Sequence, residues 1–148
     1  MALNRESSLG YLTNWAGRLL ARELERHLAH LGLAPAHMPV LFALEAGEAS
    51  QKAIAEIASV EQATMTATLN RMERDGLISR RPNPDDGRSQ LVSLTPKARN
   101  KLPQVEAAAR AVNASVLDQL TPEEGEQYVV LIRKVIAALQ ALEGSRQA

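Results

Sequence analysis

One strand-like segment, LISRRPNPDDGRSQLVSLT at residues 77–95, interrupts a chain whose apolar residues otherwise recur at helical spacing. Its two ends, LISRR and QLVSLT, alternate as paired strands do, and the Asp86-Gly87 pair between them is a strong tight-turn signal. Val92 and Leu94 share one face of the second strand. The segment therefore predicts a single β-hairpin in a mainly helical protein.

Helices are predicted on both sides of the hairpin. Before it, apolar residues three or four apart, with glycines in helix-ending positions, indicate four helices. We expect these helices at residues 8–31, 35–46, 52–59 and 61–76.

After the hairpin, Thr95 followed by proline predicts a helix N-terminus. We expect this helix to run to Leu120, with an interruption at Pro103 because proline cannot donate a helical hydrogen bond. Thr121 and Glu124 have the spacing of a capping box, which opens a last helix.

The order of these elements indicates a winged helix-turn-helix, in which two short helices joined by a tight connection precede a two-stranded hairpin. Ile54 and Ile57 of the first of these helices are expected to face the core. In the second helix, Met65, Leu69 and Met72 form the inward stripe, so its opposite face is available for DNA.

The outward face of the helix at 61–76 carries residues suited to reading bases in a major groove. Glutamine and asparagine bind adenine through two hydrogen bonds, threonine methyl groups contact thymine, and small residues allow close approach. The predicted recognition residues are Gln62, Ala63, Thr64, Thr66, Ala67, Asn70 and Arg71, with Arg74 on the same face.

The hairpin is predicted to be the wing, with Arg88 near its tip entering a minor groove. Asp86 is expected to pair with the Arg88 guanidinium and hold it extended. The alternative is a solubilising surface hairpin with incidental charges.

Composition excludes several other classes of protein. The 17 basic and 17 acidic residues cancel, so any nucleic-acid binding must depend on a placed element and not on bulk charge. Aromatic residues make up 3% of the chain, too few for a single-strand stacking platform. The chain has no cysteine, and we find no catalytic or phosphate-binding motif. We expect a cytoplasmic, non-enzymatic protein without cofactor, membrane span or secretory signal.

The segment VEQATMTATLNRMERDGLISRRPNPDDGRSQLVSLTPKA, residues 60–98, resembles the core of the multiple-antibiotic-resistance regulator (MarR) family. The shared features are the TMT and RMERDGL runs of the recognition helix and the Asp86/Arg88 pair ahead of an LVxLT strand. This chain departs from the common pattern at Ala67 and Gly87, where many members carry arginine. Residues 62–91 hold five basic and four acidic residues, which predicts modest non-specific DNA affinity.

The resemblance implies a single domain over residues 1–148. Residues 35–95 would form the winged helix-turn-helix core, and residues 1–34 and 96–148 the helices of a homodimer. Each subunit would place its recognition helix in a major groove and its wing in the flanking minor groove of a pseudopalindromic operator. Such regulators usually repress a promoter until a small, often aromatic, acid binds.

Two further clusters are candidate ligand sites. The resemblance places an effector pocket between the terminal helices and the DNA-binding core, against the recognition helix. Its candidate lining residues are Tyr11, Trp15, Arg18, His37 and Met38. Alternatively, Trp15 belongs to the core or to the dimer interface. Glu23, His27 and His30 share one side of the first helix at metal-ligand spacing, but solvated residues are the better interpretation, and we assign no metal site.

Three interpretations therefore remain. The leading one is a ligand-responsive dimeric repressor. The others are a winged-helix module that binds protein without sequence-specific DNA binding, and a metal-responsive regulator that uses His27 and His30.

Overall fold

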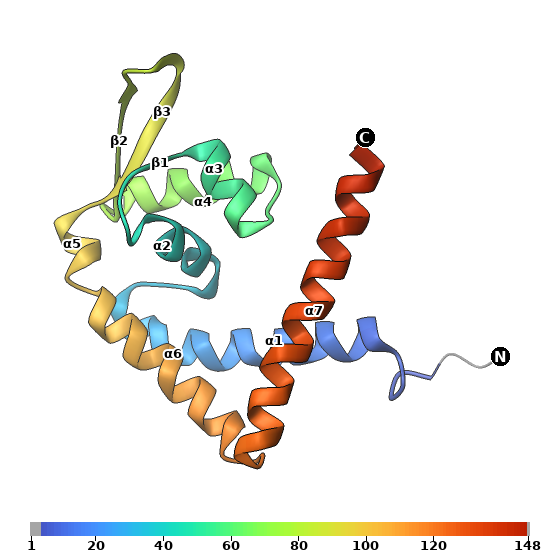
Figure 1. The fold of residues 1–148 in the computed structure, drawn as a ribbon. Helices are drawn as coiled ribbons and strands as arrows, with labels where there is room; N and C mark the ends of the chain where they lie inside the picture. Colours follow the sequence, from blue (N-terminus) through green and yellow to red (C-terminus); the bar gives the residue numbers. More distant parts are fainter. Residues whose placement is uncertain (1–3, 148) are drawn as a thin grey trace. The chain divides into compact units, whose positions relative to one another are not determined.

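The chain's first long helix is α1, Leu9–Leu28, in the computed structural model, which describes residues 4–147 (Figure 1). The side chain of Ser8 caps its N-terminus by accepting a hydrogen bond from the Tyr11 backbone N–H at 3.4 Å. At the other end the chain tightens into a 3-10 turn, η1, Ala29–Leu31. Gly32 then adopts a left-handed conformation with φ of 68°, which favours glycine. The predicted helix at 8–31 and its glycine stop are confirmed.

The helix-turn-helix follows, and its helices lie close to their predicted positions. Ser50 caps α3 by accepting a hydrogen bond from the Ala53 backbone N–H at 3.1 Å. Ser59 has φ of 51° and forms the sharp turn between α3 and α4. The elements in this region are η2 Pro35–His37, α2 Met38–Leu44, β1 Ala49–Ser50, α3 Gln51–Ala58 and α4 Gln62–Arg74.

The predicted hairpin is confirmed as β2, Ile78–Asn83, and β3, Asp86–Leu94, but its turn is not the one we expected. Pro84 and Asp85 form the turn, whereas the Asp86-Gly87 pair begins β3. Proline fits the first central position of a β-turn, and Asn83 Oδ1 accepts a hydrogen bond from the Asp85 N–H at 3.0 Å. Pro84 and Asn83 therefore place the turn two residues before the one that the Asp-Gly pair predicted.

A third strand was not predicted, because β1 is too short to show a periodic pattern. Ala49 and Ser50 pair with Val92 and Leu91 of β3. The sheet is antiparallel in the order β1-β3-β2. It joins the start of α3 to the wing.

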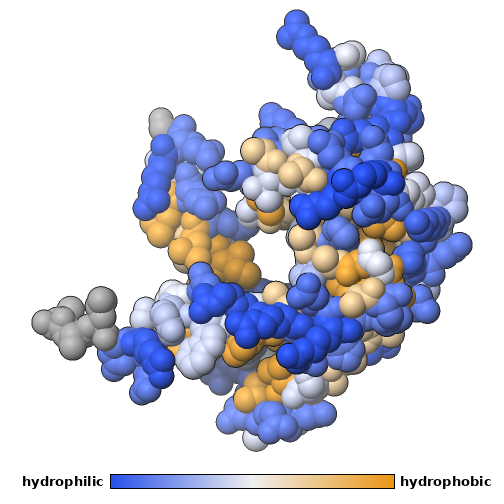
Figure 2. All heavy atoms as spheres, turned by 180° about the vertical axis from the view of Figure 1, so that it is seen from behind, coloured by the Kyte–Doolittle hydropathy of each residue, from blue (hydrophilic) through white to orange (hydrophobic). Residues whose placement is uncertain are grey.

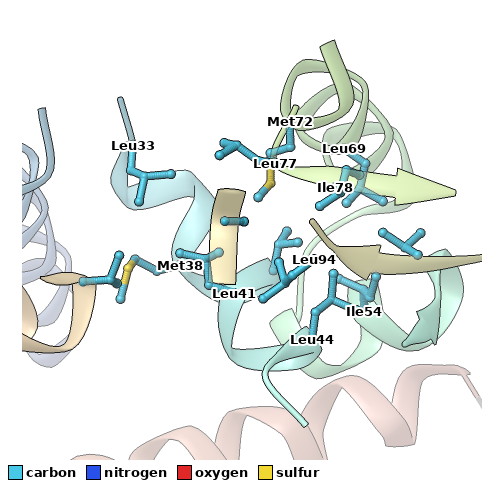
Figure 3. Close-up of a cluster of buried hydrophobic side chains, with 14 of the residues drawn as sticks. Leu33, Met38, Leu41, Leu44, Ile54, Leu69, Met72, Leu77, Ile78 and Leu94 are labelled. Carbon is cyan, nitrogen blue, oxygen red and sulfur yellow. The ribbon is translucent and has the colours of Figure 1, made fainter. Parts of the chain in front are cut away.

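The core lies between the sheet and the surrounding helices (Figure 3). Ile54 is fully buried, but Ile57 is 64% exposed, so the expectation that both face inward was wrong for Ile57. Ala55 takes the inward position instead, and Ala58 packs against the same core, so the buried face of α3 lies on the other side of Ile54 from Ile57. The core residues labelled in Figure 3 are Leu33, Met38, Leu41, Leu44, Ile54, Leu69, Met72, Leu77, Ile78 and Leu94.

Beyond the wing, the predicted long helix is interrupted as expected near Pro103. It consists of α5, Pro96–Arg99, and α6, Leu102–Leu117, so that Pro103 lies in the first turn of α6, where its missing N–H is tolerated. Thr95 caps α5 by accepting a hydrogen bond from the Ala98 N–H at 3.3 Å.

Lysines near α5 bind the C-terminal ends of other helices. The Nζ of Lys97 donates to the Asp75 carbonyl at the end of α4, at 2.8 Å. Lys101 Nζ donates to the Leu31 carbonyl at the end of η1, at 2.6 Å. Both cations therefore lie where the helix dipole is negative.

The structure divides inside α6 into one part that ends at Ala109 and another that begins at Arg110. The second part contains the end of α6 and α7, Pro122–Gln147. The predicted capping box is present, since the Thr121 N–H donates to Glu124 Oε2 at 2.9 Å and the Glu124 N–H to Thr121 Oγ1 at 3.2 Å. Apolar side chains are exposed along α7 (Figure 2).

Among the described residues, no single helix combines the length and apolar character that a membrane crossing needs. One pair of helices, Leu9–Leu31 and Pro35–Leu44, meets the same criteria by length and composition, with an 88° bend between them.

Candidate nucleic-acid interface

The helix α4 has one buried face and one exposed face. Met65, Leu69 and Met72 are buried as predicted, and so is Thr68. The Thr68 hydroxyl is satisfied by the Thr64 carbonyl at 3.1 Å. The predicted recognition residues Gln62, Ala63, Thr64, Thr66, Ala67, Asn70 and Arg71 are all exposed.

Two of these exposed residues, Thr66 and Asn70, contact other elements. Gln51, at the start of α3, donates from Nε2 to Thr66 Oγ1 at 2.6 Å. The Thr66 hydroxyl in turn donates to the Gln62 carbonyl at 2.8 Å. The hydroxyl therefore joins α3 to α4, and the Thr66 methyl group remains for contact with a base.

Asn70 contacts the wing strand β2. Its Oδ1 accepts a hydrogen bond from Arg80 Nη2 at 2.9 Å. Arg80 Nε also lies 3.2 Å from Glu73 Oε2. Gln51 and Arg80 were absent from our sequence prediction, because their contacts join residues far apart in the chain and leave no local pattern.

At the wing, Asp86 binds the backbone of Arg88 and not its guanidinium. Asp86 Oδ1 accepts a hydrogen bond from the Arg88 N–H at 3.0 Å, a common arrangement for aspartate in turns. Within residues 4–147 the Arg88 guanidinium makes no ion pair. The expected guanidinium pair is thus replaced by a contact that shapes the tip and leaves the Arg88 charge available. Hydrophilic side chains cover the wing in Figure 2.

The neighbouring arginine of the wing is engaged elsewhere. Arg81 donates from Nε to Glu48 Oε2 at 2.9 Å, and Nη2 binds the other carboxylate oxygen. This pairing lowers the pKa of Glu48, since the hydrogen bond from Arg81 favours the charged carboxylate. Arg81 and Arg88 therefore differ in their availability to a phosphate.

A groove of about 680 Å³ separates the wing from the N-terminal ends of α3 and α4. Lys52 and Gln62 line its helical side, and Arg88 and Gln90 line the wing side. Arg80 of β2 is also among its lining residues. Its basic and amide groups suit an anionic, hydrogen-bonding ligand such as a phosphodiester.

His37, the last residue of η2, is buried. Its side chain is 8% exposed, and Nδ1 accepts a hydrogen bond from the Ala34 backbone N–H at 3.1 Å. Burial, followed by the positive charge of Arg71, lowers the pKa of His37, whereas Asp75 acts in the opposite direction. The neutral imidazole is therefore the form that this packing favours.

The candidate effector residues fall into two groups. Tyr11 and Trp15 stack edge to face with ring centroids 6.0 Å apart on the exposed N-terminal half of α1. Arg18 binds Asn14 Oδ1 at 2.6 Å. His37 and Met38 are buried near the other end of α1, which is about 20 Å of helix beyond Trp15.

Met38 also lines a cavity of about 520 Å³ between α2 and the first half of α6. Phe42, Leu102 and Glu106 line the same cavity. Tyr11, Trp15 and Arg18 are not among its lining residues.

In the histidine cluster of α1, His27 contacts Glu23 of the same helix. His27 Nε2 lies 3.5 Å from Glu23 Oε1. In the described part of the chain, no three histidine, aspartate or glutamate side chains gather closely enough to hold a metal ion.

Comparison with known proteins places these features in a family. The sequence profile of the MarR family matches residues 31–89. A probable transcriptional regulator from Pseudomonas aeruginosa is 28% identical, with a TM-score of 0.81 over 89% of this chain and 99% of the other.

Two further solved structures contain DNA. A mutant MarR from E. coli complexed with operator DNA is 26% identical, with a TM-score of 0.80 over 86% of this chain and 92% of the other. The transcriptional repressor CouR, bound to a 23-mer DNA duplex, is 25% identical, with a TM-score of 0.77 over 93% of this chain and 99% of the other. With its exposed recognition helix and its wing, the chain is similar in sequence and fold to the MarR family of winged helix-turn-helix transcriptional regulators.

Proposed function

We propose that this protein is a homodimeric repressor that occupies a pseudopalindromic operator near its target promoter and leaves it when a small ligand binds. The observation that carries the proposal is the groove between the wing and the helices, with Arg88 on one wall and Lys52 and Gln62 on the other. Duplex DNA is complementary to this groove in shape and charge, because an anionic phosphodiester backbone separates each major groove from its minor groove.

In the proposed complex, α4 enters the major groove and the wing enters the adjacent minor groove. Gln62, Ala63 and Ala67 would face base edges, and the Thr66 methyl group would meet a thymine. Arg88 would enter the minor groove, where a narrow A·T-rich sequence concentrates negative potential. Asp86 supports this role by shaping the backbone at the wing tip.

The proposed dimer is supported by apolar side chains that remain exposed on both terminal helices. Leu9, Leu12 and Leu19 of α1 are 64%, 40% and 48% exposed. On α7, Leu139 and Leu142 are 56% and 54% exposed. Such surfaces are typical of protein interfaces, and a two-fold dimer would let two recognition helices read half-sites about 34 Å apart. Residues 1–34 and 96–148 would then serve dimerisation, and residues 35–95 DNA binding.

We further propose that the ligand is a small aromatic acid. Two places support such a site: the Tyr11–Trp15 pair with Arg18 nearby on α1, and the cavity beside Met38, whose size suits a small molecule. Titration of aromatic acids against the fluorescence of Trp15 and against DNA affinity distinguishes them. Quenching of Trp15 favours the α1 site, and loss of DNA affinity without quenching favours the Met38 cavity.

The test of DNA recognition is selection of duplexes from a random library by the purified protein, followed by light scattering of the complex. We expect a two-fold symmetric sequence bound by two subunits. Enrichment of no sequence above the input library would contradict the proposal and favour the protein-binding alternative. Selection of an asymmetric site by one subunit would contradict the dimer alone.

A further inference from the structure

The guanidinium of Arg80 connects the wing strand to the recognition helix. Nη2 donates to Asn70 Oδ1 at 2.9 Å, and Nε lies 3.2 Å from Glu73 Oε2. The Arg80 side chain is 19% exposed. Its Nε is buried and close to the Glu73 carboxylate but not aligned for a hydrogen bond, so the charge of Glu73 is its main compensation.

This contact changes the role that the sequence indicated for Asn70. An asparagine reads adenine by presenting its carbonyl oxygen and its amide nitrogen to the base together. Here the carbonyl oxygen accepts a charge-assisted hydrogen bond, which is stronger than a neutral one and fixes the orientation of the amide. Reading a base would require Asn70 to turn away from a largely buried cation, which is unfavourable.

We propose that Arg80 is a positioning residue for DNA recognition and that Asn70 and Glu73 serve as its anchors on α4. The inference rests on the proposed function, because DNA must occupy the helix and the wing together. Arg80 holds these two surfaces at one spacing before DNA arrives, so binding does not have to order one relative to the other. Base reading then falls to residues nearer the N-terminus of α4, such as Gln62.

The next residue on β2 provides a matched control. Arg81 carries the same charge on the same strand, but it pairs with Glu48, outside α4. Arg81→Gln therefore removes a wing cation without changing any contact to the recognition helix. Arg80→Gln also removes a wing cation, and with it the contacts to both anchors on α4.

The first experiment measures affinity for the duplex selected by the wild type, by fluorescence anisotropy at several salt concentrations. We expect Arg80→Gln to weaken binding about tenfold and Arg81→Gln to weaken it less than about threefold. The slope of log affinity against log salt should be the same for Arg80→Gln and wild type. A slope reduced by about 0.9 per lost contact would make Arg80 a phosphate ligand and overturn the proposal.

The second experiment separates positioning from base reading. Asn70→Ala is measured on the selected duplex and on a series of single base-pair variants. We expect the same fold-loss on every duplex, and we expect the Arg80→Gln/Asn70→Ala double variant to bind no more weakly than Arg80→Gln. Loss of discrimination at one A·T pair alone would show that Asn70 reads a base, and would overturn the proposal.

A purely structural role for Arg80 is tested by counting active molecules. If Arg80→Gln lowers the fraction of protein that binds while the folded molecules keep wild-type affinity, the positioning role is wrong. Arg80→Lys retains the charge and one of the two contacts, and we expect it to recover part of the lost affinity. If Arg80→Gln does not fold, the same measurements of affinity, salt slope and base discrimination are made on Arg80→Lys and on Asn70→Ala, whose substituted side chain is exposed. A wild type that selects no DNA contradicts the proposed function itself, whereas the outcomes above contradict only the role of Arg80.

Discussion

Gln51 at the start of α3 donates a hydrogen bond of 2.6 Å to the hydroxyl of Thr66 on α4. The same hydroxyl donates to the Gln62 carbonyl one turn earlier. The Thr66 side chain therefore has two separable parts. Its hydroxyl fixes the helix-turn-helix, and its methyl group is the part available to a thymine.

Two substitutions of Thr66 separate these parts. Thr66→Val keeps a methyl group and removes the hydroxyl, so we expect a loss of about 1 kcal/mol in unfolding free energy and an unchanged base preference. Thr66→Ser keeps the hydroxyl and removes the methyl group, so we expect near-normal stability and weaker discrimination of thymine at one operator position. Denaturant unfolding and binding to single base-pair variants measure the two effects. A Thr66→Ser protein with wild-type discrimination would contradict the assignment.

His37 makes the stability of the fold dependent on pH. Burial and the nearby Arg71 charge lower the pKa of His37, while Asp75 opposes them, so the folded chain binds fewer protons than the unfolded one between the folded pKa and about 6.5. We expect stability to be greatest above pH about 6.5 and to fall as the pH decreases toward the folded pKa. Thermal unfolding between neutral and mildly acidic pH measures this change.

The controls for His37 are two asparagine substitutions. His37→Asn supplies an oxygen that can accept the Ala34 N–H but does not titrate, so its unfolding midpoint should depend less on pH than that of wild type. His30→Asn removes an exposed imidazole from η1 and should retain the wild-type dependence. Equal pH dependence of His37→Asn and wild type would show that other groups cause the acid loss.

Lys97 stabilises the C-terminal end of α4. Its ammonium group donates to the Asp75 carbonyl at 2.8 Å. Lys97→Met should therefore lower the unfolding free energy by about 1 kcal/mol. Lys52→Met makes the same change in the first turn of α3, where the helix dipole disfavours a cation, and should not destabilise the fold. Denaturant unfolding of the two variants measures the contrast, and equal losses would contradict a role for the helix end.

The charges at the interface predict a moderate salt dependence of DNA binding. On α4 and the wing, Arg74, Arg80 and Arg81 lie in ion pairs. In the described chain, Lys52, Arg71 and Arg88 of α3, α4 and the wing make no ion pair, which leaves three available cations in each subunit. For a dimer we expect log affinity against log salt to have a slope of about −5. A slope near −10, as for a strongly basic repressor, would contradict this assignment.

The sequence predicted the elements whose causes are local. Backbone conformation, capping and periodicity act over a few residues. They determine the helix terminus at Gly32, the helix start at Thr121 and the inward stripe of α4. The same reasoning failed at Ile57, because a short helix of mostly small residues does not fix which face is buried. It failed at the wing turn because Pro84 outcompeted a neighbouring Asp-Gly signal.

The candidate site was predictable only in part for a related reason. Exposure of the recognition face follows from helical periodicity, but the partners of Asn70 and Thr66 lie on β2 and α3. Such contacts depend on how elements pack and not on residue spacing. Sequence reasoning therefore predicted which face of α4 is exposed, but it could not predict which residues on that face contact β2 or α3.

The most direct measurement of the central claim is the affinity of Arg88→Ala for a duplex selected by the wild type, beside Arg81→Ala as the matched control. Both substitutions remove an arginine from the same hairpin, but Arg81 is paired with Glu48 and Arg88 is not ion-paired within residues 4–147. If the hairpin is a DNA-reading wing, Arg88→Ala should lose at least about tenfold in affinity, while Arg81→Ala remains close to wild type. Equal affinity of Arg88→Ala and wild type would contradict the account, and would leave DNA recognition to α4 alone.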